Sequence, residues 1–135
     1  MGKKSELPLL YALRHVMLAV LVALWMTAAA LTHWPQLSGV PNVGDKTLHL
    51  VGYFGLAGAL WLALYAYRTR LPWRPILTLA IMSAYGAIDE ITQPYFQRSC
   101  DIRDWYTDVL GTLAAIVLLE MLAFVAARLR KGAKA

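Results

Sequence analysis

The sequence predicts an all-α integral membrane protein, a four-helix transmembrane bundle with both termini in the cytoplasm. The first observation is composition: 59% of the 135 residues are hydrophobic and only 16% are charged, whereas soluble domains average about 45–50% apolar and about 25% charged residues. The second is the presence of four apolar stretches, each about 20 residues long, the length that a helix needs to cross a bilayer. The third is the uneven distribution of Lys and Arg along the chain.

The four predicted spans are separated by loops that contain Gly and Pro, the residues that favour turns. The spans are roughly Leu9 to Leu31, Leu48 to Tyr67, Pro75 to Gln93 and Asp108 to Arg128. We expect a cytoplasmic tail at 1–8, a single membrane domain over 9–128 and a basic cytoplasmic tail at 129–135. The first span has the basic start of a signal peptide, but Arg14 and His15 interrupt its apolar run, and we expect the span to be retained.

Charge predicts the orientation of the spans. Ten of the 13 Lys and Arg residues lie in or near the two tails or in the loop 68–74. Because cytoplasmic loops carry an excess of Lys and Arg, this predicts a multi-pass protein of the cytoplasmic (inner) membrane, with the loops 32–47 and 94–107 outside. Orientation also explains the net charge of +5, so we expect no nucleic-acid partner.

The second predicted span begins with a polar face. Asp45, His49 and Tyr53 are spaced four residues apart and therefore share one side of a helix. One interpretation is a helix start stabilised by Asp45, with Tyr53 at the membrane interface. The other is a functional site in which Asp45 orients His49, with Lys46 beside them.

The third predicted span ends with Asp89 and Glu90 one turn inside an apolar segment. An Asp at the centre of a span costs about 2.5–3.5 kcal/mol, and less near the interface. The dipole at a helix C-terminus disfavours negative charge as well. One interpretation is a solvated helix end. The other is a site for a cation, a proton or a metal, with Tyr85 and Gln93 on the same face as Asp89.

Acidic residues also lead into the fourth predicted span. Asp101, Asp104 and Asp108 form one stripe if a helix begins near Asp101. The alternative for the stripe is a capped helix start with surface ion pairs, which contribute little energy. Gly111 continues the stripe and would let another helix approach closely. We expect the same close packing at a small-residue face of the second span, formed by Gly52, Gly55 and Gly58.

Glu120 lies in the cytoplasmic half of the fourth predicted span, about 18 Å along the helix from Asp108. One interpretation is structural: Glu120 pairs with Arg14, which enters the first span from the cytoplasmic side, or extends toward the basic C-terminal tail. The other is a proton-transfer step on the inner side of the membrane.

Together these residues resemble the signature of the VanZ-like family of bacterial membrane proteins. The resemblance covers roughly residues 40–120, and Glu90 followed by Gln93 fits its third-span pattern better than Asp89 does. It implies a small multi-spanning bacterial membrane protein, and the founding member of the family is associated with resistance to the glycopeptide teicoplanin. The matching residues are Asp45, Lys46, His49, Tyr53, Glu90, Gln93, Arg98, Asp101, Asp104, Asp108 and Gly111.

The polar residues at the outer ends of the second, third and fourth spans fit an enzyme. Such an enzyme would act on the phosphate or pyrophosphate of an envelope lipid or of a lipid-linked cell-wall precursor. A divalent cation, Mg²⁺ or Ca²⁺, would neutralise the phosphate charge. This hypothesis assigns catalysis to His49, Asp45 and Glu90, metal binding to Glu90, Asp104 and Asp108, and substrate binding to Lys46, Tyr53, Gln93 and Arg98.

Two other functions stay open. A non-catalytic protein could use the same residues to bind an envelope lipid, a cell-wall precursor or a glycopeptide. A proton-coupled transporter rests on Glu120 alone and would require an oligomer, because four spans are few for a pathway through one chain. The single cysteine, Cys100, excludes an internal disulfide. We expect four residues to approach one another within the length of a water bridge: Asp45, His49, Glu90 and Asp108.

Overall fold

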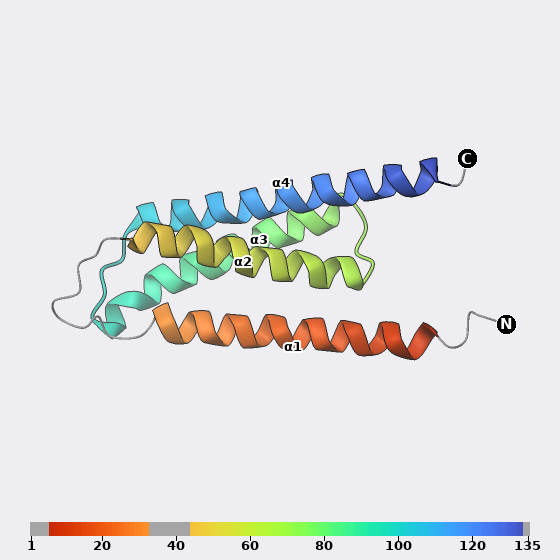
Figure 1. Ribbon diagram of the computed structural model, residues 1–135. Coiled ribbons are helices and arrows are strands. Elements are labelled where there is room, and N and C mark those ends of the chain that lie inside the picture. The colour runs from red at the N-terminus through yellow and green to blue at the C-terminus, as the bar shows by residue number, and fades with distance from the viewer. Residues whose placement is uncertain (1–5, 33–43, 134–135) are drawn as a thin grey trace.

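The computed structural model describes residues 6–32 and 44–133, and within these ranges the chain forms helices and no strand. The helices are α1 (Glu6–Thr32), α2 (Asp45–Ala66), α3 (Trp73–Thr92) and α4 (Ile102–Gly132), with a short 3-10 helix, η1 (Gln93–Phe96), after α3. Figure 1 shows the start of α1 and the end of α4 at the same end of the bundle. The all-α prediction is confirmed, and each predicted span coincides with one helix.

Two of the helices are long and apolar enough to cross a membrane: Lys46–Ala66 in α2 and Ile102–Gly132 in α4. α1 contains a shorter apolar stretch, Arg14–Ala30, and α3 carries charged residues near both of its ends. Only 22% of the most apolar part of α4 is buried within the molecule. Such a large outward apolar surface is typical of a membrane interaction. Spanning is therefore supported for two helices and stays a prediction for the other two.

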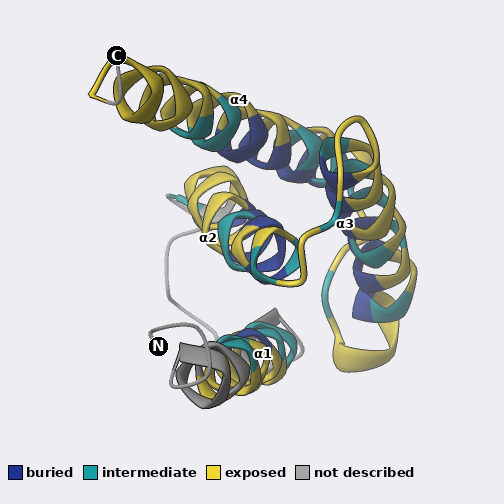
Figure 2. Cartoon of the chain, turned by 90° about the vertical axis from the view of Figure 1, so that its right-hand side faces the viewer, coloured by how far each residue is buried: buried dark blue, intermediate teal, exposed yellow. Residues whose placement is uncertain are grey.

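α2 lies at the centre of the bundle and packs against each of the other three helices. In Figure 2, α2 lies between α1 and the pair formed by α3 and α4, and the buried faces of α2, α3 and α4 point inward. Among its described side chains, α1 buries one hydrophobic residue, Leu21. The core consists of Leu21, Tyr53, Leu56, Ala57, Leu60, Ala63, Met82 and Ala115.

Close contact between α2 and α4 depends on Gly111. A methyl group at this position would overlap the carbonyl oxygen of Leu50 and lie 3.1 Å from the backbone nitrogen of Phe54. The prediction for Gly111 is confirmed. Among the described residues, the predicted small-residue face of α2 is wrong as a site of close packing, because a Cβ at Gly52 or Gly55 would meet none of them within 4 Å, and one at Gly58 would make only an ordinary contact.

Candidate functional site

His49 on α2 and Asp108 on α4 form a buried pair. The His49 Nδ1 atom lies 2.8 Å from Asp108 Oδ1, and the two residues are 5% and 0% exposed. A carboxylate in this position fixes the orientation of the imidazole ring and directs Nε2 toward a different partner. The sequence predicts Asp45 as the orienting carboxylate. The side chain of Asp45 lies outside the described residues, and the partner that the structure gives His49 is Asp108.

α3 approaches this pair through Gly86. A Cβ at Gly86 would lie 2.9 Å from Asp108 Oδ2 and 3.3 Å from the rings of Tyr53 and Trp105. Trp105 Nε1 also donates a hydrogen bond to the carbonyl oxygen of Ser83 at 3.0 Å, which joins the start of α4 to α3. Sequence reasoning missed Gly86, although a glycine one turn before Glu90 is a signal of close helix approach.

Glu90 on α3 is the third member of a buried group. One potential ligand atom from each of His49, Glu90 and Asp108 lies within 4.8 Å of the other two. Glu90 Oε1 accepts a hydrogen bond from Gln93 Nε2 at 3.1 Å, and Glu90 Oε2 accepts one from the backbone N–H of Asp101 at 2.9 Å. These two bonds fix the carboxylate and explain the spacing of Glu90 and Gln93. The group formed by His49, Glu90 and Asp108 is named the outer cluster below.

Several buried polar atoms around the outer cluster have no hydrogen-bond partner among the described residues. They are Asp108 Oδ2, the hydroxyl groups of Tyr53 and Tyr85, and Thr112 Oγ1. Burying one such group without a partner costs about 1–3 kcal/mol. Native proteins bury few unpaired polar atoms. Several such atoms in one region therefore indicate a ligand-binding site, and this indication does not depend on the distances within the outer cluster.

An aromatic row connects α1 with the outer cluster. Trp25 stacks on Tyr85 with ring centroids 4.9 Å apart, Tyr85 lies 5.9 Å from Tyr53, and Tyr53 stacks on His49 at 6.3 Å. Tyr53, a predicted substrate-binding residue, is almost completely buried. Trp25 and Thr112 were not predicted as site residues. For Thr112 the available signal is its position one helical turn after Asp108.

Lys46 lies at the edge of the outer cluster, with about half of its side chain exposed. Its Nζ atom is 2.8 Å from Asp104 Oδ1 and 3.6 Å from Asp101 Oδ2. Asp104 is therefore the ion-pair partner of Lys46. The sequence assigns metal binding to Glu90, Asp104 and Asp108, whereas the group of potential ligand atoms in the structure contains His49 and not Asp104. Asp101 caps α4 by accepting a hydrogen bond from the backbone N–H of Arg103. That bond, followed by the nearby Lys46 ammonium, lowers the pKa of the Asp101 carboxyl below its ordinary value of 3.8.

Asp89 and Arg98 lie on either side of Gln93. Asp89 is buried near the end of α3, and Arg98 is half-buried in the loop that leads to α4. The backbone N–H of Arg98 donates to the carbonyl oxygen of Gln93 at 3.3 Å, which places Arg98 near the residue that holds Glu90. The predicted phosphate-binding role of Arg98 stays a prediction.

Glu120 pairs with a residue that sequence reasoning did not assign to it. Arg74 Nε and Nη2 donate to Glu120 Oε1 and Oε2 at 3.0 and 2.7 Å, and Trp61 Nε1 donates to Oε1 at 2.9 Å. The predicted pair of Glu120 with Arg14 is therefore corrected to a pair with Arg74. The physical reason is the packing, since α3 lies against α4 whereas α1 packs mainly against α2. Arg14 lies over the ring of Tyr67 instead, 5.8 Å from its centroid.

These features define a class of protein: a helical bundle with an apolar exterior and a buried, histidine-containing polar cluster at one end. Ionisable groups inside such a bundle are typical of functional membrane proteins. The chain belongs to the VanZ/LLP1 family, whose family model matches residues 5–124. The match extends the resemblance found in the sequence to α1. Comparison with curated proteins and with solved structures gave no match.

Proposed function

We propose that this chain is a multi-pass protein of the bacterial inner membrane. We propose that it acts on the phosphate head group of an envelope lipid at the extracytoplasmic face of that membrane. In this proposal a divalent cation bound by the outer cluster neutralises the phosphate charge. The observation that carries the proposal is the convergence of one potential ligand atom each from His49, Glu90 and Asp108 within 4.8 Å, in a buried position.

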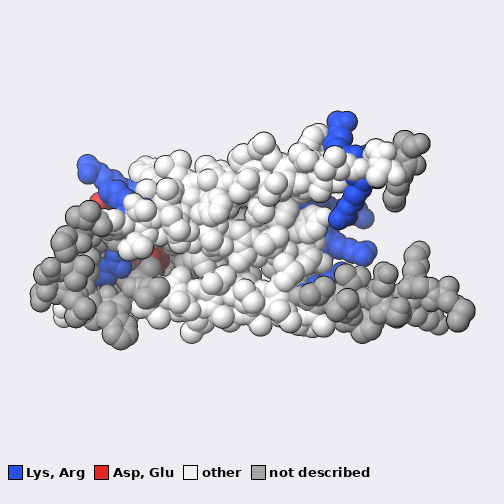
Figure 3. Space-filling view, viewed as in Figure 1, with Lys and Arg blue, Asp and Glu red and all other residues white. Residues whose placement is uncertain are grey.

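The distribution of charge supports the orientation in the proposal. In Figure 3, Lys and Arg side chains lie at the two ends of the described chain, and the surface between them is white. Such an uncharged belt matches the hydrocarbon layer of a bilayer. Ten of the 13 Lys and Arg residues lie in or near the two tails or in the loop 68–74, which favours the cytoplasm for the end where α1 begins and α4 ends, and the outside for the outer cluster.

The donor set favours a particular kind of cation. Mg²⁺ and Ca²⁺ prefer oxygen ligands, whereas imidazole with carboxylates suits ions such as Zn²⁺ and Mn²⁺. His49 Nδ1 and Asp108 Oδ1 lie 2.8 Å apart, so they would be neighbouring ligands of one cation, which would take the place of the proton between them. The presence of His49 in the group therefore changes the expected ion from Mg²⁺ or Ca²⁺ to Zn²⁺ or Mn²⁺, and makes His49 a ligand instead of an acid or base.

Lys46 provides the second part of the proposed site. It combines an ammonium group at the edge of the outer cluster with a side chain that is 53% exposed. A lipid phosphate at the membrane surface could replace Asp104 as the ion-pair partner of the Lys46 ammonium. One oxygen of the same phosphate would then approach the cation. Hydrolysis would break a phosphorus–oxygen bond of the lipid and form one to the oxygen of a water, one proton of which would pass to the departing lipid oxygen; a cation held by His49, Glu90 and Asp108 would supply charge neutralisation.

Burial favours a second candidate function, which is binding without turnover. A catalytic cation keeps an open position for water and substrate, whereas His49 and Asp108 are 5% and 0% exposed. A closed cation site would hold the helices together while Lys46 and its neighbours bind a lipid or a cell-wall precursor.

The test uses the full chain purified in detergent, with Zn²⁺ and Mn²⁺ as separate probes. Metal content and affinity are measured for the wild type, for Glu90→Gln, and for the control Asp101→Asn, which alters an exposed acid at the rim. The same proteins are incubated with phosphatidic acid and with a polyprenyl pyrophosphate, and lipid mass spectrometry follows the loss of phosphate.

The enzyme proposal predicts that the wild type and Asp101→Asn bind the cation and release phosphate, and that Glu90→Gln does neither. Cation and lipid binding without phosphate release would establish the non-catalytic function. Equal cation binding by the wild type and Glu90→Gln, or no cation binding at all, would refute the cation site.

A further inference from the structure

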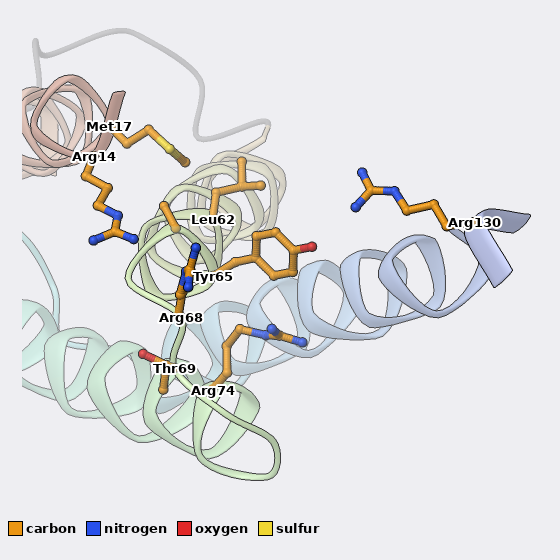
Figure 4. Close-up of a pocket in the computed structure, with 9 residues that line it drawn as sticks. Arg14, Met17, Leu62, Tyr65, Arg68, Thr69, Arg74 and Arg130 are labelled. Atoms are coloured by element: carbon orange, nitrogen blue, oxygen red, sulfur yellow. The ribbon is translucent and has the colours of Figure 1, made fainter. Parts of the chain in front are cut away.

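A pocket of about 610 Å³ opens at the opposite end of the bundle from the outer cluster. Its walls come from α1, α2, the loop after α2, α3 and α4. Figure 4 shows that each of these elements except α2 contributes one arginine: Arg14, Arg68, Arg74 and Arg130. Among the described residues that line the pocket, none is Asp or Glu. The pocket therefore concentrates positive charge from parts of the chain that are distant in sequence.

Arg74 is held rigidly at the base of this pocket. Its guanidinium makes two hydrogen bonds to Glu120 and lies over two aromatic rings, 4.3 Å from the centroid of Trp61 and 5.1 Å from that of Tyr65. Glu120 offsets the charge of Arg74, and neither Arg68 nor Arg130 has an ion pair with a described residue.

Arg68 enters the pocket from a constrained backbone position. Its φ of 59° lies in the left-handed region, which is uncommon for residues other than glycine. Two backbone hydrogen bonds fix this conformation. The N–H of Arg68 donates to the carbonyl oxygen of Tyr65, and the N–H of Thr69 donates to the carbonyl oxygen of Leu64, both at 2.9 Å. This pair of hydrogen bonds around a left-handed residue is a common way for a helix to end, and it holds Arg68 in a fixed position just after α2.

Apart from Thr69, the remaining walls of the pocket are mostly apolar. Met17 of α1 and Leu62 of α2 line it together with the ring of Tyr65. Leu62 is 41% exposed on the outer surface of the bundle, where lipid chains would lie if α2 spans the membrane. A molecule that fits this pocket therefore has an anionic head and an adjacent apolar part.

We infer that this pocket binds the head group of an anionic lipid that carries more than one phosphate charge, as in the cardiolipin class. Guanidinium groups bind phosphate oxygens through pairs of parallel hydrogen bonds. Basic pockets between membrane helices on the cytoplasmic side are suited to such head groups. The volume of about 610 Å³ lies within the range of about 300–1,000 Å³ found for small-molecule sites. The inference uses none of the residues of the outer cluster and does not depend on its function.

The test compares two double variants with the same net charge. Arg68→Gln with Arg130→Gln removes two pocket arginines and leaves the Arg74–Glu120 pair intact. Arg70→Gln with Arg128→Gln is the matched control, because it removes one arginine from the same loop and one from α4, and neither lines the pocket. Native mass spectrometry of the full chain in detergent measures binding of cardiolipin and of phosphatidylglycerol. Pyrophosphate and inorganic phosphate serve as soluble probes.

We expect the wild type and the control to bind cardiolipin more tightly than phosphatidylglycerol. Loss of two arginines near a head group should weaken cardiolipin binding about thirtyfold. Equal weakening in the two double variants, or none in either, would overturn the pocket as the binding site. Binding of soluble pyrophosphate as tight as that of cardiolipin would overturn the lipid as its ligand. Thermal unfolding of both variants near that of the wild type would show that folding does not account for the loss.

Discussion

Replacing Gly111 by alanine tests whether the close contact of α2 and α4 builds the outer cluster. The new methyl group would overlap the carbonyl oxygen of Leu50, which precludes a local adjustment of side chains alone. Forced backbone shifts of this kind cost about 1–3 kcal/mol, and the better helix propensity of alanine returns about 0.5–1 kcal/mol. We therefore expect Gly111→Ala to lower the free energy of unfolding by about 1–2 kcal/mol.

The same substitution should also weaken cation binding. Leu50 directly follows His49, and Gly111 lies three residues after Asp108, so separating the two helices lengthens the contact between His49 and Asp108. Changes to the support of metal ligands typically reduce affinity about 10- to 100-fold. We expect at least about a tenfold loss of Mn²⁺ affinity, measured by titration of the purified protein.

The matched control is Gly55→Ala, at which a Cβ would meet nothing within 4 Å. This variant should be as stable as the wild type or more stable by up to about 1 kcal/mol. Unfolding is followed by tryptophan fluorescence in mixed micelles with increasing SDS. If Gly111→Ala and Gly55→Ala unfold at the same SDS fraction, the argument from close packing is refuted.

Three further predictions address orientation, the inner ion pair and the helix cap. An impermeant maleimide should label Cys100, the exposed single cysteine, in intact spheroplasts, whereas Lys131→Cys on a Cys100→Ser background should be labelled only after permeabilisation; the reverse pattern would contradict the proposed orientation. Glu120→Gln removes the acceptor charge for Arg74 and should lower the free energy of unfolding by about 1–3 kcal/mol in the SDS assay; a silent substitution would show that the pair contributes nothing to stability. Asp101→Ala should destabilise the protein through loss of the α4 cap, and Asp101→Asn should do so much less. Folding lowers the pKa of Asp101. The contribution of its charge to the free energy of unfolding is therefore complete above about pH 4 and is lost as the pH falls through the lower pKa of the folded state. An unchanged difference in stability between the wild type and Asp101→Asn across that range would contradict this prediction.

The fold could be predicted from the sequence because its main signals are local. The length of the apolar stretches and the positions of Gly and Pro predict the helices without knowledge of their neighbours. Gly111 could be predicted as well, since it continues the stripe of Asp104 and Asp108. The glycines of α2 show the limit of this reasoning. A row of small residues predicts a face but not whether another helix lies against it, and a Cβ at Gly52 or Gly55 would meet no neighbour in the part of the chain that the structure describes.

The sequence places His49, Glu90 and Asp108 at one end of the bundle, where they do meet, but the individual contacts between helices could not be predicted. The contact of His49 with Asp108 joins residues 59 positions apart, whereas the side chain of Asp45, which the sequence offers as a partner, lies outside the described residues. For Glu120, the sequence offers several arginines near the cytoplasmic end, and only the packing of α3 against α4 selects Arg74. Helical periodicity determines which residues share a face of one helix. The rotation and order of the helices determine which faces meet, and no local pattern in this sequence reveals them.

The close contact at Gly86 makes the residues that three helices can accept at this point depend on one another. A single added methyl group at this position would touch Asp108 of α4, Tyr53 of α2 and Trp105 of α4. A larger residue could therefore be accepted only together with changes at those positions, because residues that share a contact do not vary independently in their effects. Among related sequences, residue 86 should remain glycine or should change in step with residues 53, 105 and 108. Variation at these positions would record the geometry of the outer cluster even in relatives for which no activity is known.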